Sequence, residues 1–264
     1  VDEATGKTIC SWYDAERKGQ LIDTQTSYAL PLAFHVVDGD LQKKMAAHLA
    51  AAIKTPMAGY PAYSLLTGFI GTAWISKALS DNGMSEEAYR LLQYEGYPSW
   101  LYPVKNGATT IWERLNSYTV KDGFGENNSM NSFNHYSFGA VASWMYNYSL
   151  GICRDEKSPG FKHFILKPEV DPTRGITHAE GYYDSMYGRI RSRWQYTDSG
   201  IRYEFTVPAN TTASLYLPAP AVSFISENGK PLKKASGVRY VSADKELHHL
   251  ELASGSYQFD IKQK

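Results

Sequence analysis

The chain has 264 residues, 43% of them hydrophobic, and its 27 Lys and Arg residues balance 27 Asp and Glu residues. This size allows one large domain or two ordinary ones, and the zero net charge gives no global electrostatic reason to bind nucleic acid. No apolar run is long enough to cross a membrane. The aromatic share of 14% fits either a β-rich fold or platforms for sugar rings, and composition does not separate these alternatives.

The two cysteines, Cys10 and Cys153, stand far apart and belong to no CxxC or Cys/His pattern. We therefore expect two buried free thiols and no metal site. The first residues, Val1 to Thr5, carry neither the positive nor the apolar segment of a signal peptide. Localisation is expected to be periplasmic or secreted if a signal peptide lies upstream, and cytoplasmic otherwise.

From about residue 20 to residue 152 the periodicity is helical. A first helix, ended by Pro56, is predicted from apolar residues at four-residue spacing: Leu41, Met45, Leu49 and Ile53. A second helix is predicted over residues 65–79, with an inward face made of Phe69, Ile70, Ala73, Trp74 and Ala78. A further helix is predicted over residues 136–150, ended by Gly151. The long connectors between these helices are of the kind that usually carries function.

After residue 159 the period changes to two, which indicates strands. The clearest strand covers residues 186–196. Other alternating runs begin near Ile201, Leu215, Leu250 and Tyr257. Strands at this spacing, separated by Gly, Pro and Asn turns, predict a β-sandwich. The change of period predicts two domains, residues 1–155 and residues 156–264.

Three arginines, Arg189, Arg191 and Arg193, alternate along the clearest strand. They are compatible with an anion site. The preferred interpretation is a solvated polar face of a half-buried strand, because charge runs of this kind usually face solvent.

The densest unusual stretch covers residues 97–114, which show no sustained helical period. Glu113 lies there among aromatic and β-branched neighbours. A carboxylate in such a setting is partly desolvated, which favours a role as an acid or a base. The alternative is that Glu113 simply pairs with Arg114 or with another arginine. Glycan cleavage normally needs a second carboxyl group, and no other carboxyl in the chain stands out as that partner.

A second polar cluster, residues 131–136, lies just before the last predicted helix. Asn134 and His135 at a helix entry place an amide and an imidazole beside free backbone donors, which suits the recognition of hydroxyl groups. The alternative is that Asn131 or Asn134 caps the helix and that His135 is structural.

Residues 107–114 read Gly-Ala-Thr-Thr-Ile-Trp-Glu-Arg, and residues 131–136 read Asn-Ser-Phe-Asn-His-Tyr. This pair of motifs, in this order, resembles bacterial α-L-rhamnosidases of glycoside hydrolase family 78. Five further segments share the resemblance: residues 23–30, 67–72, 139–141, 159–161 and 165–168. The resemblance implies part of an (α/α)6 catalytic barrel in residues 1–155, followed by an all-β sandwich in residues 156–264.

The resemblance also implies an inverting hydrolase that releases terminal α-L-rhamnose from a glycoside or polysaccharide and requires no cofactor. By this likeness Glu113 is the general base and His135 contacts the sugar. Asn134 belongs to the same polar cluster. Trp100 and Trp112 are expected as aromatic walls of the pocket because of their place in the loop.

The family barrel has twelve helices, and this chain has room for about half of them. The resemblance places the general acid on the earlier half, so we expect the missing N-terminal half of the barrel to be a partner. A half barrel would expose apolar faces, and the isolated chain is therefore expected to be inactive. Two alternatives stay open: a carbohydrate-binding or scaffolding fragment without catalysis, and a hydrolase of another glycoside on the same fold.

Overall fold

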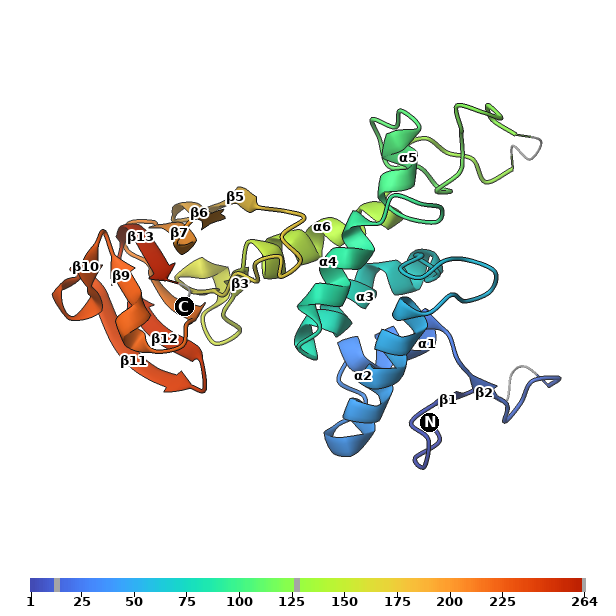
Figure 1. Cartoon of the computed structure of the whole chain (residues 1–264), viewed down its shortest axis with the longest axis horizontal. Helices are drawn as coiled ribbons and strands as arrows, with labels where there is room; N and C mark the ends of the chain where they lie inside the picture. The colour runs from blue at the N-terminus through green and yellow to red at the C-terminus, as the bar shows by residue number, and fades with distance from the viewer. Residues whose placement is uncertain (12–14, 126–128, 263–264) are drawn as a thin grey trace. The chain divides into compact units, whose positions relative to one another are not determined.

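The computed structural model describes residues 1–11, 15–125 and 129–262, and the chain forms two compact units, residues 1–143 and 144–264 (Figure 1). The first unit is mainly helical and the second is mainly built from strands. The predicted change from helices to strands along the chain is therefore confirmed. In the described part of the chain the helices do not close into a barrel, and none is long and apolar enough to span a bilayer.

The first unit begins with a short antiparallel pair, β1 (Thr8–Ile9) and β2 (Leu21–Ile22). Its helices are α1 (Gln25–Ala33), α2 (Gly39–Lys54), α3 (Gly68–Asp81), α4 (Ser85–Gln93) and α5 (Leu101–Lys105). Helix α1 begins with a capping box, in which the backbone amide of Ser27 donates to Thr24 Oγ1 and the amide of Thr24 donates to Ser27 Oγ. The box satisfies two of the amide groups that a helix start leaves without intrahelical partners.

The first predicted helix is confirmed as α2. Its residues Met45, Leu49 and Ile53 are fully buried, and Leu41 at the start of the helix is half-buried. The helix ends at Lys54, before Pro56, as the sequence predicts. The four-residue spacing thus forms the face that packs into the core of this unit.

The second predicted helix is present as α3, but its predicted inward face was wrong in part. Ile70 is 71% exposed, whereas Gly71, Ile75 and Leu79 are buried. A Cβ atom on Gly71 would lie 2.3 Å from Thr26 Oγ1 of α1. The helices therefore meet at a glycine, and this close approach, rather than the largest side chains, decides which face of α3 is turned inward.

The segment predicted as one helix over residues 136–150 holds three short helical pieces. They are a 3-10 turn (Ser137–Ala140), α6 (Val141–Trp144) and a π-helical turn (Met145–Ser149). Gly151 ends the run, as predicted, with a φ of 68° that favours glycine. A Cβ atom there would also lie 2.1 Å from the backbone nitrogen of Pro168, so glycine is required for space as well.

The second unit contains two sheets. The six-stranded sheet has the order β10-β9-β13-β7-β6-β5, and the five-stranded sheet has the order β11-β12-β8-β4-β3. The strands are β3 (Ile152–Arg154), β4 (His163–Leu166), β5 (His178–Ser185), β6 (Gly188–Thr197), β7 (Gly200–Val207), β8 (Thr212–Pro218), β9 (Ile225–Glu227), β10 (Lys230–Pro231), β11 (Val238–Asp244), β12 (Leu247–Leu252) and β13 (Gly255–Lys262). Strand β4 runs parallel to β8, whereas neighbours in the six-stranded sheet are antiparallel.

The alternation predicted for the clearest strand is confirmed by β6. Ile190 and Trp194 are fully buried, as are Tyr203 and, nearly so, Phe205 on the adjacent β7. The indole Nε1 of Trp194 donates to the carbonyl of Ser149 at 2.8 Å, so the largest side chain of this core has a partner for its polar atom.

The three arginines of β6 lie on a solvated polar face of the sheet, which is the preferred interpretation of this run in the sequence. Each arginine has a carboxylate partner on a neighbouring strand: Arg189–Asp184, Arg191–Glu180 and Arg193–Glu204. Pairs exposed to this extent contribute little to stability, because solvent screens their charges.

Both cysteines are free thiols, as predicted, but neither is fully buried. Cys153 lies on β3, an edge strand of the five-stranded sheet, and its Sγ donates to the carbonyl of Asn147 at 2.9 Å. Cys10 directly follows the short strand β1. Edge positions leave one side of a residue uncovered, which explains why the expected burial was wrong.

Candidate functional site

Two segments far apart in the sequence run side by side, one ending at Glu113 and the other at His135. The amide of Glu113 donates to the carbonyl of Ser132, and the amide of His135 donates to the carbonyl of Ile111, both at 2.9 Å. Neither segment forms a helix or a strand in the described part of the chain. The structure thus brings together Glu113 and the polar cluster around His135, which the sequence singled out separately.

The carboxylate of Glu113 is held by this pairing and lines an open pocket of about 370 Å³. Its Oε2 accepts a hydrogen bond from the amide of Ser132 at 2.9 Å, and the side chain is half-buried. Among the described residues that line the pocket, Glu113 is the one carboxylate. A carboxylate fixed at the edge of an open pocket can accept a proton from a water molecule within hydrogen-bond reach.

Aromatic side chains form much of the pocket wall. The rings of Tyr60 and Tyr97 lie edge to face with centroids 5.8 Å apart, and those of Phe69 and Phe138 lie 5.4 Å apart. Burial raises the pKa of Tyr97 above its usual value. Its phenol is protonated at neutral pH, as in an ordinary tyrosine, and can donate a hydrogen bond. A wall of this kind can pack against the apolar face of a sugar ring and bind its hydroxyl groups.

His135 lies directly behind one of these rings. Its imidazole stacks on Phe69 with centroids 4.8 Å apart, and its Nδ1 accepts a hydrogen bond from the amide of Ser137 at 3.4 Å. His135 is half-buried, and it is not among the residues that line the pocket. Asn134 is exposed, and its amide donates to Ser132 Oγ at 3.2 Å.

Both tryptophans of the predicted site are buried, 9% exposed for Trp100 and 6% for Trp112, and neither lines the pocket. The Nε1 of Trp100 donates to the carbonyl of the pocket residue Phe138 at 2.9 Å. Trp112 packs edge to face against Tyr118 and Phe133, with centroids 6.5 and 5.2 Å away. Within this chain the two indoles support the pocket segments from behind.

The sequence did not single out Tyr60, Phe69 or Tyr97 as pocket residues. Phe69 belongs to residues 67–72, which share the family resemblance, and Tyr97 begins the aromatic-rich stretch, so both had a usable signal. Tyr60 had none, because it stands in a turn far from either polar cluster.

A buried amide positions another part of the wall. Gln25, 1% exposed on α1, donates through Nε2 to the carbonyl of Ser64 and accepts through Oε1 from the amide of Leu66, both at 2.8 Å. Leu65 between them donates its amide to the carbonyl of Pro98 at 2.8 Å. Helix α1 therefore fixes the segment whose leucines line the pocket.

The described residues contain no candidate metal site, because no three His, Cys, Asp or Glu side chains among them lie close enough together to hold an ion.

Comparison with protein-family models gives two matches. Residues 4–149 match the bacterial alpha-L-rhamnosidase 6 hairpin glycosidase domain, and residues 151–231 match the bacterial alpha-L-rhamnosidase C-terminal domain. Among curated proteins, an alpha-L-rhamnosidase of Streptomyces avermitilis is 34% identical over 248 residues, which cover 94% of this chain and 22% of the relative. One of Alteromonas sp. is 34% identical over 241 residues, 90% of this chain and 24% of the relative. The chain thus spans about a quarter of their length.

Solved structures give the same picture. The crystal structure of Streptomyces avermitilis alpha-L-rhamnosidase complexed with L-rhamnose matches with a TM-score of 0.80 and 33% identity, over 96% of this chain and 22% of that one. The alpha-L-rhamnosidase of Dictyoglumus thermophilum matches with a TM-score of 0.75 and 27% identity, over 91% and 25%.

Proposed function

Because the chain belongs to the bacterial alpha-L-rhamnosidase 6 hairpin glycosidase family, we propose that the protein containing it hydrolyses terminal α-L-rhamnosides. The observation that carries the proposal is Glu113, a carboxylate fixed by Ser132 at an open aromatic pocket. The relative from Streptomyces avermitilis has been crystallised with L-rhamnose, which supports rhamnose as the sugar.

The proposed reaction is a single displacement. Glu113 removes a proton from a water molecule, and the water oxygen attacks the anomeric carbon while the glycosidic bond breaks on the opposite face. A carboxylic acid protonates the leaving oxygen, so the products are the alcohol and rhamnose of inverted configuration. This geometry needs the two carboxyl groups roughly 6.5–9.5 Å apart, to leave room for the water.

The proton donor is proposed to come from a part of the protein beyond these 264 residues. Two observations support this. Glu113 is the one carboxylate among the described pocket residues, and the chain spans about a quarter of the curated relatives it matches. The pocket is also wide open on this chain, as expected for one side of a larger site.

The remaining residues have supporting roles in this proposal. His135 and Asn134, at the polar end of the segment that holds Glu113, would bind ring hydroxyls of the sugar. Trp100 and Trp112 would support the pocket segments from behind, Trp100 through its hydrogen bond to the carbonyl of Phe138. Stacking of His135 on Phe69 links the imidazole to the pocket.

The test uses the longest natural polypeptide that contains this chain and an aryl α-L-rhamnoside. We expect L-rhamnose release, and we expect Glu113→Gln to lower kcat by at least about 10²-fold, because the amide cannot accept the proton. Proton NMR of the first product should show the β anomer. The matched control is Glu95→Gln, because Glu95 is exposed, pairs with Lys105 and lies outside the pocket.

Each other outcome has a defined meaning. Equal loss in Glu95→Gln would show a general effect of charge, and full activity in Glu113→Gln would place the base elsewhere. Retention of the α anomer would exclude single displacement. Rhamnoside binding without hydrolysis would support the carbohydrate-binding alternative, and hydrolysis restricted to another glycoside would retain the fold and replace the substrate.

A further inference from the structure

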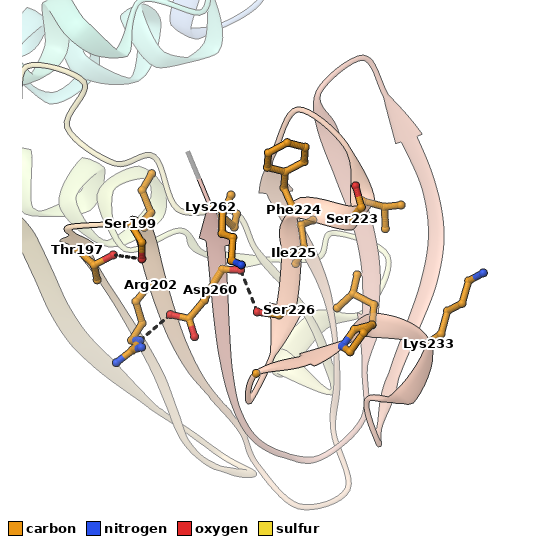
Figure 2. A pocket seen from close by; sticks show the side chains of 16 residues that line it. Thr197, Ser199, Arg202, Ser223, Phe224, Ile225, Ser226, Lys233, Asp260 and Lys262 are labelled. Atoms are coloured by element: carbon orange, nitrogen blue, oxygen red, sulfur yellow. Dashed lines mark hydrogen bonds and ion pairs between the residues drawn. The ribbon is translucent and has the colours of Figure 1, made fainter. Parts of the chain in front are cut away.

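The second unit contains a pocket of its own, with a volume of about 730 Å³ (Figure 2). It lies at the end of the six-stranded sheet, where β7 begins, β13 ends and β9 begins. The turns after Thr197 and after Ala221 complete its border. Its volume falls within the range of small-molecule sites, roughly 300–1,000 Å³.

A row of polar groups crosses three neighbouring strands along one side of this pocket. Asp260 on β13 is the register partner of both Arg202 on β7 and Ser226 on β9. Arg202 Nε donates to Asp260 Oδ1 at 2.7 Å, and Ser226 Oγ donates to the Asp260 carbonyl at 3.5 Å. Figure 2 shows these side chains following one another across the sheet. A guanidinium, a carboxylate and a hydroxyl in one row can bind the adjacent hydroxyl groups of a sugar.

An apolar floor and one aromatic ring complete the site. Ile225 and Ile261 are buried beneath it, and the half-buried ring of Phe224 stands at the end of the pocket opposite Arg202 (Figure 2). An aromatic face beside polar side chains is the arrangement that packs on one face of a sugar ring while the hydroxyl edges are bound.

The pocket is positively charged, although the whole chain is neutral. Its lining holds three cations, Arg202, Lys233 and Lys262, and one carboxylate, Asp260, which leaves a net charge of 3 − 1 = +2. Within residues 1–11, 15–125 and 129–262, neither lysine has an ion-pair partner. Lys262 lies beside Asp260, whereas the side chain of Lys233 lies on the far side of Ser226 and points away from the polar row (Figure 2). The ammonium group of Lys262 is therefore the positive charge available to a ligand bound along the polar row.

We propose that this pocket binds one unit of an acidic saccharide, with the ring on Phe224, hydroxyl groups on Asp260 and Ser226, and the anionic group at Lys262. Sugar hydroxyl groups are suitable partners for the polar row, the sugar ring fits against the aromatic end of the pocket, and an anionic group fits the positive charge of the lining. A simple phosphate would leave Phe224 and most of the volume unused. The proposal goes beyond the pocket at Glu113 and does not depend on the role of that residue.

Binding is tested on the same long polypeptide by titration calorimetry at low and at physiological salt. The probes are α-1,4-linked oligomers of galacturonic acid and the same oligomers with methyl-esterified carboxyl groups, which keep the shape and lose the charge. We expect the acid form to bind about tenfold more tightly at low salt, with the difference shrinking as salt screens the lysines. A sulfated neutral oligosaccharide shows whether the anion is recognised as a carboxylate or as any charge.

Substitutions place the binding in this pocket. Lys262→Gln should weaken the acid form about tenfold and leave the ester within about twofold. Phe224→Ala should weaken both forms about tenfold, because it removes the ring platform. Lys234→Gln is the matched control: it lies outside the lining and, like Lys262→Gln, removes one positive charge.

Thermal unfolding checks that each variant is folded, and hydrolysis of an aryl rhamnoside, where present, should be unchanged in all of them. Equal affinity for acid and ester, or no binding of either at millimolar concentration, would overturn the proposal. So would a loss in Lys234→Gln as large as in Lys262→Gln. A failure of the rhamnosidase assay bears on Glu113 alone, because these measurements record binding and not turnover.

Discussion

Each of the two units of the chain is stabilised internally in a different way. In residues 144–264, ladders of paired strands satisfy the backbone groups and large side chains such as Trp194 and Phe259 fill the core. In residues 1–143, the stretch from the end of α5 to residue 136 has no helix or strand among its described residues, and yet it contains Glu113. That stretch depends on single hydrogen bonds and ring contacts.

This difference indicates where each kind of change will act. A sheet spreads the effect of one substitution over many bonds, so a large loss requires a fully buried side chain. A segment fixed by few contacts can change its geometry when a single hydrogen bond is lost. Such a loss affects function more than the free energy of unfolding. The following variants test this contrast between the sandwich core and the irregular segment that contains Glu113.

The largest effect is expected from Trp194→Ala in the sandwich core. The side chain is fully buried, and its Nε1 donates to the carbonyl of Ser149. Its removal leaves a large cavity and should lower the free energy of unfolding by about 3–5 kcal/mol. Chemical denaturation measures the change. Met186→Ala, at a residue 81% exposed, should stay within about 0.5 kcal/mol. Similar losses in both would contradict the assigned core.

Gln25→Leu tests the buried amide behind the pocket that Glu113 lines. It leaves the carbonyl of Ser64 and the amide of Leu66 without their partner and should lower the free energy of unfolding by about 2–3 kcal/mol. Because these groups belong to the pocket wall, kcat/KM should fall as well. Gln42→Leu removes a glutamine bonded to Asn82, away from the pocket, and should spare kcat/KM. Equal kinetic effects would show that Gln25 has no positioning role.

Phe69→Leu tests the pocket ring on which the imidazole of His135 stacks. Loss of a ring face that contacts the sugar, worth about 1 kcal/mol, should raise KM for an aryl rhamnoside about fivefold. Loss of the ring contacts with His135 and Phe138 should lower the free energy of unfolding by about 0.5–1.5 kcal/mol. Phe34→Leu also removes a ring contact, to Trp74 at 4.6 Å, but outside the pocket. An unchanged KM in Phe69→Leu would exclude the ring from sugar binding.

The smallest effect is a dependence of stability on pH. The hydrogen bond from Lys7, with a second from Tyr28, holds the pKa of Asp23 below its usual value. A lowered folded pKa stabilises the fold above the unfolded pKa of about 3.9, and this contribution is lost as the pH falls through the folded pKa. Asp23→Asn should therefore flatten the fall in melting temperature below about pH 4.

The control for this measurement is Asp38→Asn, which removes an exposed carboxylate whose side chain makes no capping bond to α2. The control should keep the acid-induced decline of the native chain. Identical pH profiles for the native chain and Asp23→Asn would show that the bond to Lys7 does not favour the ionised form.

Much of the fold could be predicted because the periodicities are local. The spacing of Met45, Leu49 and Ile53 predicts α2 and its buried face, and the alternation around Trp194 predicts β6. The face of α3 could not be predicted, because it depends on Gly71 meeting Thr26 of another helix. A pattern within one helix contains no information about where a partner helix approaches.

The candidate site likewise has features that could be predicted from the sequence and features that could not. The sequence by itself determined the chemistry, because the carboxylate of Glu113 and the motifs around Asn134 and His135 are properties of the chain. Only the tertiary structure decided that these segments pair through Ser132, that His135 stacks on the pocket residue Phe69, and that Trp100 and Trp112 are buried. The physical reason is that irregular segments have no period, so contacts between distant residues set their shape.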